Sequence, residues 1–177
     1  IIDCTFKDST SSNNGAAIST SYGNLNINGC TFENMTVKQG IVHYTGSSGF
    51  LNIANSVFNN IQGSYDGWVI STGAAASISN TNFTNLVSTQ ATSSSYYGAV
   101  YTTKNMNVTG CLFKDITGPT GAAIYATGTL NATGNVFDDI KTTISVIFAS
   151  SSPSYVNYNI FINNENAKKF IHQSSGV

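Results

Sequence analysis

The sequence predicts an all-β protein folded as a parallel β-helix, a solenoid of about seven coils of 24–30 residues that form one domain, residues 1–177. Three observations lead to this prediction. A phenylalanine recurs at a nearly constant spacing, an asparagine or aspartate follows each one two residues later, and no segment has the apolar period of about 3.6 residues that is typical of a helix. A fixed period of roughly 20–50 residues is the signature of a solenoid.

The recurring phenylalanines lie 26, 26, 25, 30, 24 and 24 residues apart. Coils that stack about 4.8 Å apart bring equivalent residues into columns. The phenylalanine column, which we expect in the core, is Phe6, Phe32, Phe58, Phe83, Phe113, Phe137 and Phe161. The polar column, which we expect to form a hydrogen-bonded ladder at a bend, is Asp8, Asn34, Asn60, Asn85, Asp115, Asp139 and Asn163.

Each repeat contains three strand-like segments, with Gly, Ser, Asn and Asp at the corners between them. The first segment alternates apolar and polar residues, at 25–27, 51–53, 77–79, 106–108 and 130–132. The second segment contains the phenylalanine. The third begins with small residues and ends with aliphatic ones, at 15–18, 40–42, 68–70, 98–100, 121–124, 145–147 and 169–171. One coil cannot bury its apolar side alone, so stacked coils must form the core.

The composition excludes two classes of partner. Charged residues make up 8% of the chain, against about 25% in an average soluble domain. There are seven lysines and no arginine, and the net charge is −1, so we expect no nucleic-acid binding. No apolar run approaches the roughly 18 residues of a transmembrane segment. The low charge fits the predicted stacking, because like charges on facing strands destabilise a sheet.

The segment "GAAI", at 15–18 and 121–124, comes before an F-x-N/D segment in both places. This combination resembles the right-handed parallel β-helix repeats of pectin-lyase-like proteins, and in particular the passenger repeats of polymorphic outer-membrane and autotransporter proteins. The resemblance covers nearly the whole chain, although Gly-Ala replaces Gly-Gly and the amide comes one residue earlier. It implies a right-handed solenoid in an extracellular or cell-surface protein.

The resemblance also raises the question of carbohydrate chemistry. Pectate-lyase-type enzymes use an Arg or Lys base beside calcium-binding carboxylates, and polygalacturonase-type enzymes use several Asp with a His-Gly and an Arg/Lys pair. The chain has no Arg and neither pattern. Because both patterns are missing, we favour a protein that is not an enzyme. The fold itself does not decide this question, since many functions share it.

One group of acids is a candidate metal site. Asp115, Asp138 and Asp139 lie on adjacent predicted coils, where they would raise one another's pKa or bind a cation such as Ca²⁺. The alternative is that Lys114 and Lys141 neutralise them. We expect no other cofactor.

Two loops form a candidate binding site. Segments 62–68 and 88–98 leave the same corner of consecutive coils and would bring together Tyr65, Asp66, Trp68, Tyr96 and Tyr97. An exposed aromatic ridge of this kind can stack on sugar rings or on a protein partner. The alternative is that the loops fold down and cover the core.

A second aromatic column, Tyr101, Tyr125, Phe148 and His172, has an ambiguous orientation. If exposed, it would form an interface. The sequence is equally compatible with its burial, because the residue before each aliphatic position of this segment is also apolar. His43 and His172 have no second ligand at a metal-binding spacing.

The three cysteines do not form a disulfide framework. Cys4 and Cys30 share a column, where the spacing permits a disulfide but the parallel Cβ vectors do not favour it. Cys111 lies too far along the solenoid to pair with Cys30. We expect buried free thiols.

N-glycosylation sequons occur at Asn34, Asn82, Asn107 and Asn131, no more often than chance predicts. If the chain is secreted by a eukaryote, we expect Asn107 and Asn131 to be the main acceptors, because they should face outward. Asn34 belongs to the polar column and should be protected.

The sequence thus favours a structural or adhesive rod outside the cell, which displays loops or stacks end to end with further coils or copies of itself. Neither end shows a cap, so we expect the chain to be part of a longer solenoid or filament. There are two alternatives. The first is a carbohydrate-binding or carbohydrate-active module, whose expected ligands are glycans. The second is an ice-binding solenoid.

Overall fold

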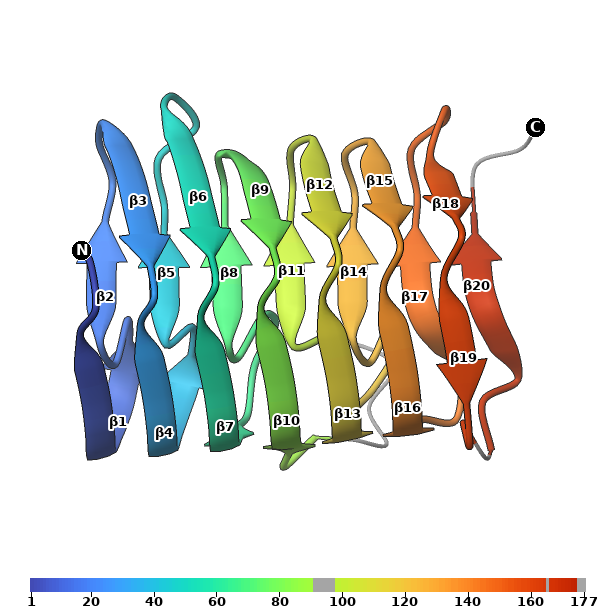
Figure 1. Cartoon of the computed structure of the whole chain (residues 1–177), viewed down its shortest axis with the longest axis horizontal. Helices are drawn as coiled ribbons and strands as arrows, with labels where there is room; N and C mark the ends of the chain where they lie inside the picture. Colours follow the sequence, from blue (N-terminus) through green and yellow to red (C-terminus); the bar gives the residue numbers. More distant parts are fainter. Residues whose placement is uncertain (91–97, 165, 175–177) are drawn as a thin grey trace.

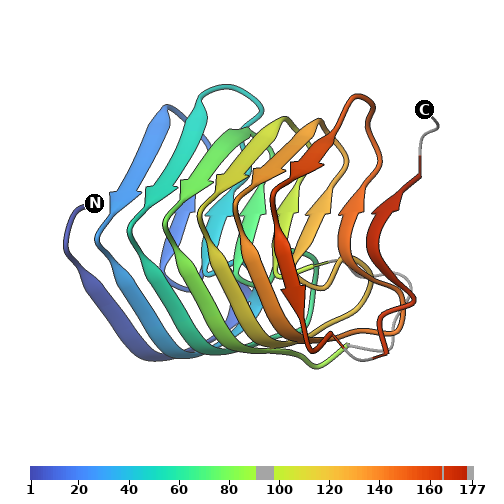
Figure 2. The same ribbon diagram turned by 45° about the vertical axis from the view of Figure 1, so that its right-hand side comes forward.

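The computed structural model describes residues 1–90, 98–164 and 166–174. The described residues form 20 strands and no helix, arranged as three parallel sheets that wrap around one core (Figures 1 and 2). None of them forms a helix that could cross a membrane. Two sheets have seven strands and the third has six, so the chain makes about six turns and the expected seven is a slight overcount.

Each coil contributes one strand to each sheet. Sheet 1 contains β1 (Thr5–Asn14), β4 (Thr31–Gln39), β7 (Val57–Gly63), β10 (Asn82–Ser88), β13 (Leu112–Thr117), β16 (Val136–Lys141) and β19 (Ile160–Ile162). Sheet 2 contains β2 (Ile18–Thr20), β5 (Val42–Tyr44), β8 (Ile70–Thr72), β11 (Val100–Thr102), β14 (Ile124–Ala126), β17 (Ser145–Ala149) and β20 (Lys169–Gln173). Sheet 3 contains β3 (Asn24–Asn28), β6 (Phe50–Ala54), β9 (Ala75–Ser79), β12 (Met106–Thr109), β15 (Leu130–Thr133) and β18 (Tyr155–Asn157).

The phenylalanine column lies inside sheet 1. Its members are Cα partners in successive strands, and neighbouring rings stack with centroids 4.6–5.1 Å apart and nearly parallel planes. The five central rings are fully buried, and Phe6 and Phe161 are half-buried in the outer coils. Each ring therefore covers the rings of the adjacent coils. Because the phenylalanines recur once per coil, their rings are separated by the distance between neighbouring strands.

The polar column bends the first six strands of sheet 1, and its last member, Asn163, follows the end of β19. All seven of its residues have left-handed backbone, with φ between 52° and 55°. Asn and Asp enter this conformation far more readily than other residues with a Cβ atom. After the bend, the next residue turns inward: Met35 and Leu86, for example, are buried.

Side-chain hydrogen bonds follow this column but do not stay within it. Asn34 Nδ2 donates to Asp8 Oδ1 at 3.0 Å, and Asn60 Nδ2 donates to Asn34 Oδ1 at 2.8 Å. Asn85 Nδ2 instead donates to Oδ1 of Asn59, the residue before Asn60 in the preceding coil, at 2.8 Å. The side chain of Asn34 is exposed, and its amide makes the two ladder hydrogen bonds on which the expected protection from glycosylation depends.

A second polar column, two residues before each phenylalanine, is buried at the corner between sheets 3 and 1. Ser56 Oγ accepts a hydrogen bond from Cys30 N at 3.2 Å, and Asn135 Oδ1 accepts one from Cys111 N at 2.9 Å. Asn135 Nδ2 donates to Val108 O at 3.0 Å. Each side chain thus bonds to backbone groups of a preceding coil at this corner.

The glycine of "GAAI" makes the corner before sheet 2. Gly121 has φ = 60°, and a Cβ atom there would collide with Phe148 of the next coil and with the Ile124 carbonyl. Both Ala123 and Ile124, which follow it, are fully buried. The tight corner explains why two consecutive apolar residues point inward here.

Replacing Asn85 with alanine should lower the free energy of unfolding by about 1–2 kcal/mol, the usual cost of a left-handed residue with a Cβ atom. Replacing it with glycine should cost clearly less, because glycine adopts this conformation without strain. Urea denaturation of both variants measures the difference. Equal losses would mean that the hydrogen bond to Asn59, rather than the backbone conformation, is the important contribution.

Replacing the buried Asn135 with alanine should cost about 1–3 kcal/mol, because it removes the interior hydrogen-bond acceptor of Cys111 N and the donor to Val108 O. The exposed Asn107→Ala is the matched control, with an expected change within about 0.5 kcal/mol. Thermal or urea denaturation monitored by circular dichroism provides both values. A loss no larger in Asn135→Ala than in the control would contradict a structural role for the buried column.

Candidate functional site

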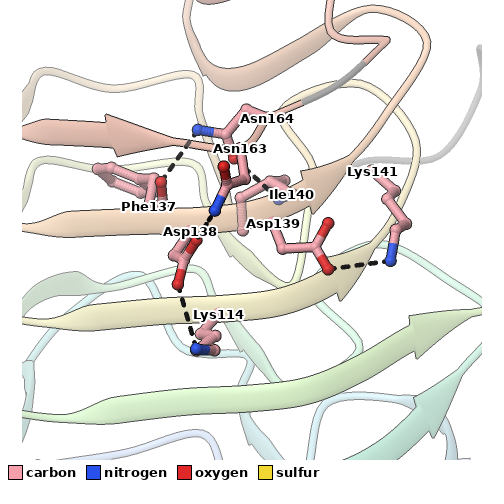
Figure 3. Close-up of polar contacts among 8 residues, drawn as sticks. All are labelled: Lys114, Phe137, Asp138, Asp139, Ile140, Lys141, Asn163 and Asn164. Atoms are coloured by element: carbon pink, nitrogen blue, oxygen red, sulfur yellow. Dashed lines mark hydrogen bonds and ion pairs between the residues drawn. The ribbon is translucent and has the colours of Figure 1, made fainter.

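The acidic cluster consists of Asp115 on β13 and Asp138 and Asp139 on β16, and Figure 3 shows the contacts of the last two. Lys114 and Asp138 are Cα partners, and Lys114 Nζ lies 3.2 Å from Asp138 Oδ2. On the other side, Asn163 Nδ2 donates to Asp138 Oδ1 at 3.2 Å. The carboxylate of Asp138 therefore has a cationic and a neutral donor from the two neighbouring coils.

Asp139 has its own cationic partner. Its Oδ2 lies 3.0 Å from Lys141 Nζ, and this hydrogen bond is the main reason that the pKa of Asp139 is lowered, with a smaller contribution from a hydrogen bond with Asp115. The pKa of Lys114 is raised, chiefly by its hydrogen bond with Asp138. Both lysines thus stabilise the ionised carboxylates.

Together with Asn163 and Lys114, the three carboxylates line an open hollow of about 360 Å³. The described residues contain no group of three or more His, Cys, Asp or Glu side chains placed to hold a metal ion. Asn164, next to the hollow, donates from Nδ2 to Phe137 O at 3.0 Å and accepts from Ile140 N at 2.8 Å (Figure 3). These contacts fasten the chain after β19 to β16, which is a structural task.

The predicted aromatic ridge does not form as expected. Trp68 is fully buried, because the absence of side chains at Gly63 and Gly118 leaves room for its indole ring inside the coil. Tyr65 is 39% exposed, with Lys38 Nζ 5.1 Å from its ring centroid, and Asp66 is partly buried. Tyr96 and Tyr97 lie outside the described residues. Trp68 is thus a core residue rather than a binding residue.

The second aromatic column lies on sheet 2 and is largely buried. Ring centroids are 5.9 Å apart for Tyr101–Tyr125, 4.3 Å for Tyr125–Phe148 and 4.9 Å for Phe148–His172. Tyr125 and Phe148 are each 8% exposed. The sequence left open whether this column is exposed or buried, and the rings of Tyr125 and Phe148 are buried.

The cysteines and sequons are distributed as follows. All three thiols are free, Cys30 and Cys111 are buried, and burial raises the pKa of Cys111 to about 11. Cys4 is exposed, which corrects the expectation that it is buried, because it lies on the outer coil.

The sequon asparagines Asn82, Asn107 and Asn131 are exposed.

The strands of sheet 3 are distinguished by the absence of charged side chains. None of its six described strands contains Asp, Glu, Lys or Arg, whereas the two ion pairs lie on sheet 1. The outward residues of neighbouring strands form in-register columns of amides and hydroxyls. The central column is Asn26, Asn52, Ser77, Asn107, Asn131 and Tyr155. Sequence reasoning missed this surface, although the alternating pattern of these strands contained the signal.

No protein-family model, curated protein or solved structure matches this chain. The parallel β-solenoid is therefore established by the strand pairing, and the resemblance to pectin-lyase-like repeats rests on the sequence pattern alone.

His43 should make the protein less stable in mild acid. Burial lowers its pKa below the ordinary value of 6.5, and its Nδ1 has no hydrogen-bond partner among the described residues. As the pH falls below about 6.5, His43 binds a proton more readily in the unfolded chain than in the folded protein. The free energy of unfolding therefore decreases. Above that pH, His43 is neutral in both states and has no effect on stability.

Urea denaturation of the wild type and His43→Gln between neutral pH and pH 5 measures this effect. The variant should lose less stability over the interval, because glutamine does not titrate. Identical pH slopes would show that His43 is protonated equally in both states. His172→Gln gives the separate contribution of the second histidine, whose pKa is also lowered by burial.

Proposed function

We propose that this chain is a structural or adhesive rod of the extracellular space or the cell surface, and that the outer surface of sheet 3 is its contact surface. The observation that carries the proposal is the absence of charge from the six described strands of this sheet. A catalytic site would need convergent titratable groups in a cleft. The titratable cluster on sheet 1 is instead engaged in ion pairs in an open hollow.

The chemistry of this surface favours a neutral, hydroxyl-rich partner. Side-chain amides offer two donors and an acceptor, and hydroxyl groups offer both functions. Asn107 and Asn131 are in register on adjacent coils, as are Thr109 and Thr133. The strand spacing of about 4.8 Å therefore repeats the same polar groups at an interval close to the length of one sugar unit of a linear polysaccharide. A neutral polysaccharide is the partner that we propose.

The rivals differ in what they require. A carbohydrate-active enzyme would release reducing sugars or unsaturated products, and an ice-binding protein would cause thermal hysteresis. The outward columns of sheet 3 mix Asn, Ser, Ala and Thr rather than repeating one threonine row, which favours a glycan over ice. Stacking of copies end to end would lengthen the rod without changing this surface.

The double variant Asn107→Lys/Asn131→Lys should reduce binding to insoluble neutral polysaccharides, such as cellulose or chitin, by roughly tenfold or more, equivalent to about 1.4 kcal/mol. Two lysines there would introduce unpaired charge into the proposed contact. Co-sedimentation of the protein with each polysaccharide measures the binding. Binding of the wild type should be insensitive to added NaCl, since the contact is neutral.

Thr36→Lys/Gln62→Lys is the matched control, because these residues are also exposed Cα partners on adjacent coils, but of sheet 1. It should bind like the wild type. If the wild type binds no neutral polysaccharide, or if both double variants lose binding equally, sheet 3 is not the contact surface.

A further inference from the structure

One aromatic side chain stands among the polar groups on the outer face of sheet 3. Phe50 begins β6, the strand that lies between β3 and β9 (Figure 1). Along β6, Phe50, Asn52 and Ala54 alternate with two fully buried residues. Successive side chains of a strand point to opposite faces. Phe50 therefore points out of the coil, on the same face as Asn52 of the central column.

Stacking between coils does not account for this ring. The buried phenylalanines of sheet 1 lie on rings of the adjacent coils, whereas the register partners of Phe50 are Asn24 and Ala75. Phe50 is 39% exposed. Among the described strands of sheet 3, Phe50 and Tyr155 are the only aromatic residues. Phe50 thus adds a flat apolar ring to a surface that otherwise offers amides, hydroxyl groups and small side chains.

The backbone before Phe50 is held in place by the core. Tyr44 is buried, and its hydroxyl oxygen lies within hydrogen-bonding distance of Gly23 O and Ser48 O, at 2.5 and 2.7 Å. Gly49 has φ = 95°, and a Cβ atom there would collide with Gly23 O and with the Tyr44 hydroxyl. The turn that leads into β6 is therefore packed tightly against the preceding coil. An anchored aromatic residue loses little conformational freedom when a ligand binds to it.

A flat ring beside hydrogen-bonding groups matches the chemistry of a pyranose sugar. When all substituents of the sugar are equatorial, its hydroxyl groups lie around the rim and its two faces consist of C–H groups. Such a face packs on an aromatic ring, and the rim hydroxyls remain available to neighbouring amides. Asn52, with Asn26 and Ser77 in register on either side, supplies these polar partners. An axial hydroxyl would project from one face of the sugar and hold it away from the ring.

We propose that Phe50 is a stacking platform for one sugar unit and selects β-linked chains whose substituents are all equatorial, as in cellulose and chitin, over mannan, whose units have an axial hydroxyl. The inference rests on the proposed polysaccharide contact of sheet 3, which it deepens. With one unit on Phe50, the neighbouring units lie over β3 and β9, because the strands are about 4.8 Å apart.

Co-sedimentation with cellulose, chitin and insoluble mannan tests the platform. The wild type should bind cellulose or chitin more tightly than mannan. Phe50→Ala should weaken the tighter binding by roughly three- to tenfold, the range expected for one aromatic contact. Phe50→Tyr should bind like the wild type, because it keeps the ring. Circular dichroism establishes that each variant is folded.

Val87→Ala is the matched control. Val87 is also an exposed apolar residue of a central strand, 44% exposed on β10, but it belongs to sheet 1. Its replacement should leave binding to each polysaccharide unchanged.

Fluorescence of Phe50→Trp tests the contact directly. The only tryptophan of the wild type, Trp68, is fully buried, so acrylamide should quench chiefly the introduced indole. A soluble chito-oligosaccharide should protect the introduced indole from quenching and should leave the quenching of the wild type unchanged.

The outcomes separate this inference from the function on which it rests. If the wild type binds and Asn107→Lys/Asn131→Lys loses binding, but Phe50→Ala binds like the wild type, the polysaccharide contact stands and the platform is overturned. Equal losses in Phe50→Ala and Phe50→Tyr, or an indole that the oligosaccharide does not protect, also overturn it. If the wild type binds no neutral polysaccharide, the proposed function fails and the platform fails with it.

Discussion

In-register stacking is the constraint on which the rest of this protein depends. Each residue of a coil lies about 4.8 Å from the equivalent residue of the next coil, so a choice at one position is repeated along a column. Phenylalanine satisfies this constraint inside sheet 1, because parallel rings cover one another at 4.6–5.1 Å. Charge satisfies it poorly, which is why the chain has so little. The facing residues Lys114 and Asp138 have opposite signs, whereas Asp115 and Asp139, neighbours in the polar column, are both acidic and lie beside Lys114 and Lys141.

The corners obey the same constraint by different chemistry. A coil can close only if the backbone turns sharply at fixed positions, and the left-handed conformation at the polar column and at glycines such as Gly121 provides these turns. Turning interrupts the regular pairing of the backbone. Buried side chains such as Asn135 restore it by bonding to groups of the neighbouring coil. The polar residues that dominate the composition are therefore as much a part of the framework as the aromatic core.

The three sheets leave the molecule with surfaces of different character. Sheet 1 has the ion pairs, sheet 2 has the aromatic column, and sheet 3 is free of charge in its described strands. A rod with an extended neutral surface suits contact with a repeating polymer better than it suits chemistry at one point.

The sequence by itself determined the columns. The spacing of Phe6 to Phe161, the residue two positions later and the absence of helical periodicity were sufficient for the fold, because in a solenoid a sequence period is a spatial period. Alternation along 106–108 and 130–132 likewise placed Asn107 and Asn131 outside.

Only the tertiary structure decided how residues outside the repeat pack. Trp68 is buried because Gly63, in the same coil, and Gly118, two coils later, leave space for its ring. Phe170 of sheet 2 stacks on Phe161 of sheet 1, with ring centroids 5.3 Å apart. These contacts join positions with no fixed sequence separation, so no period in the sequence could predict them.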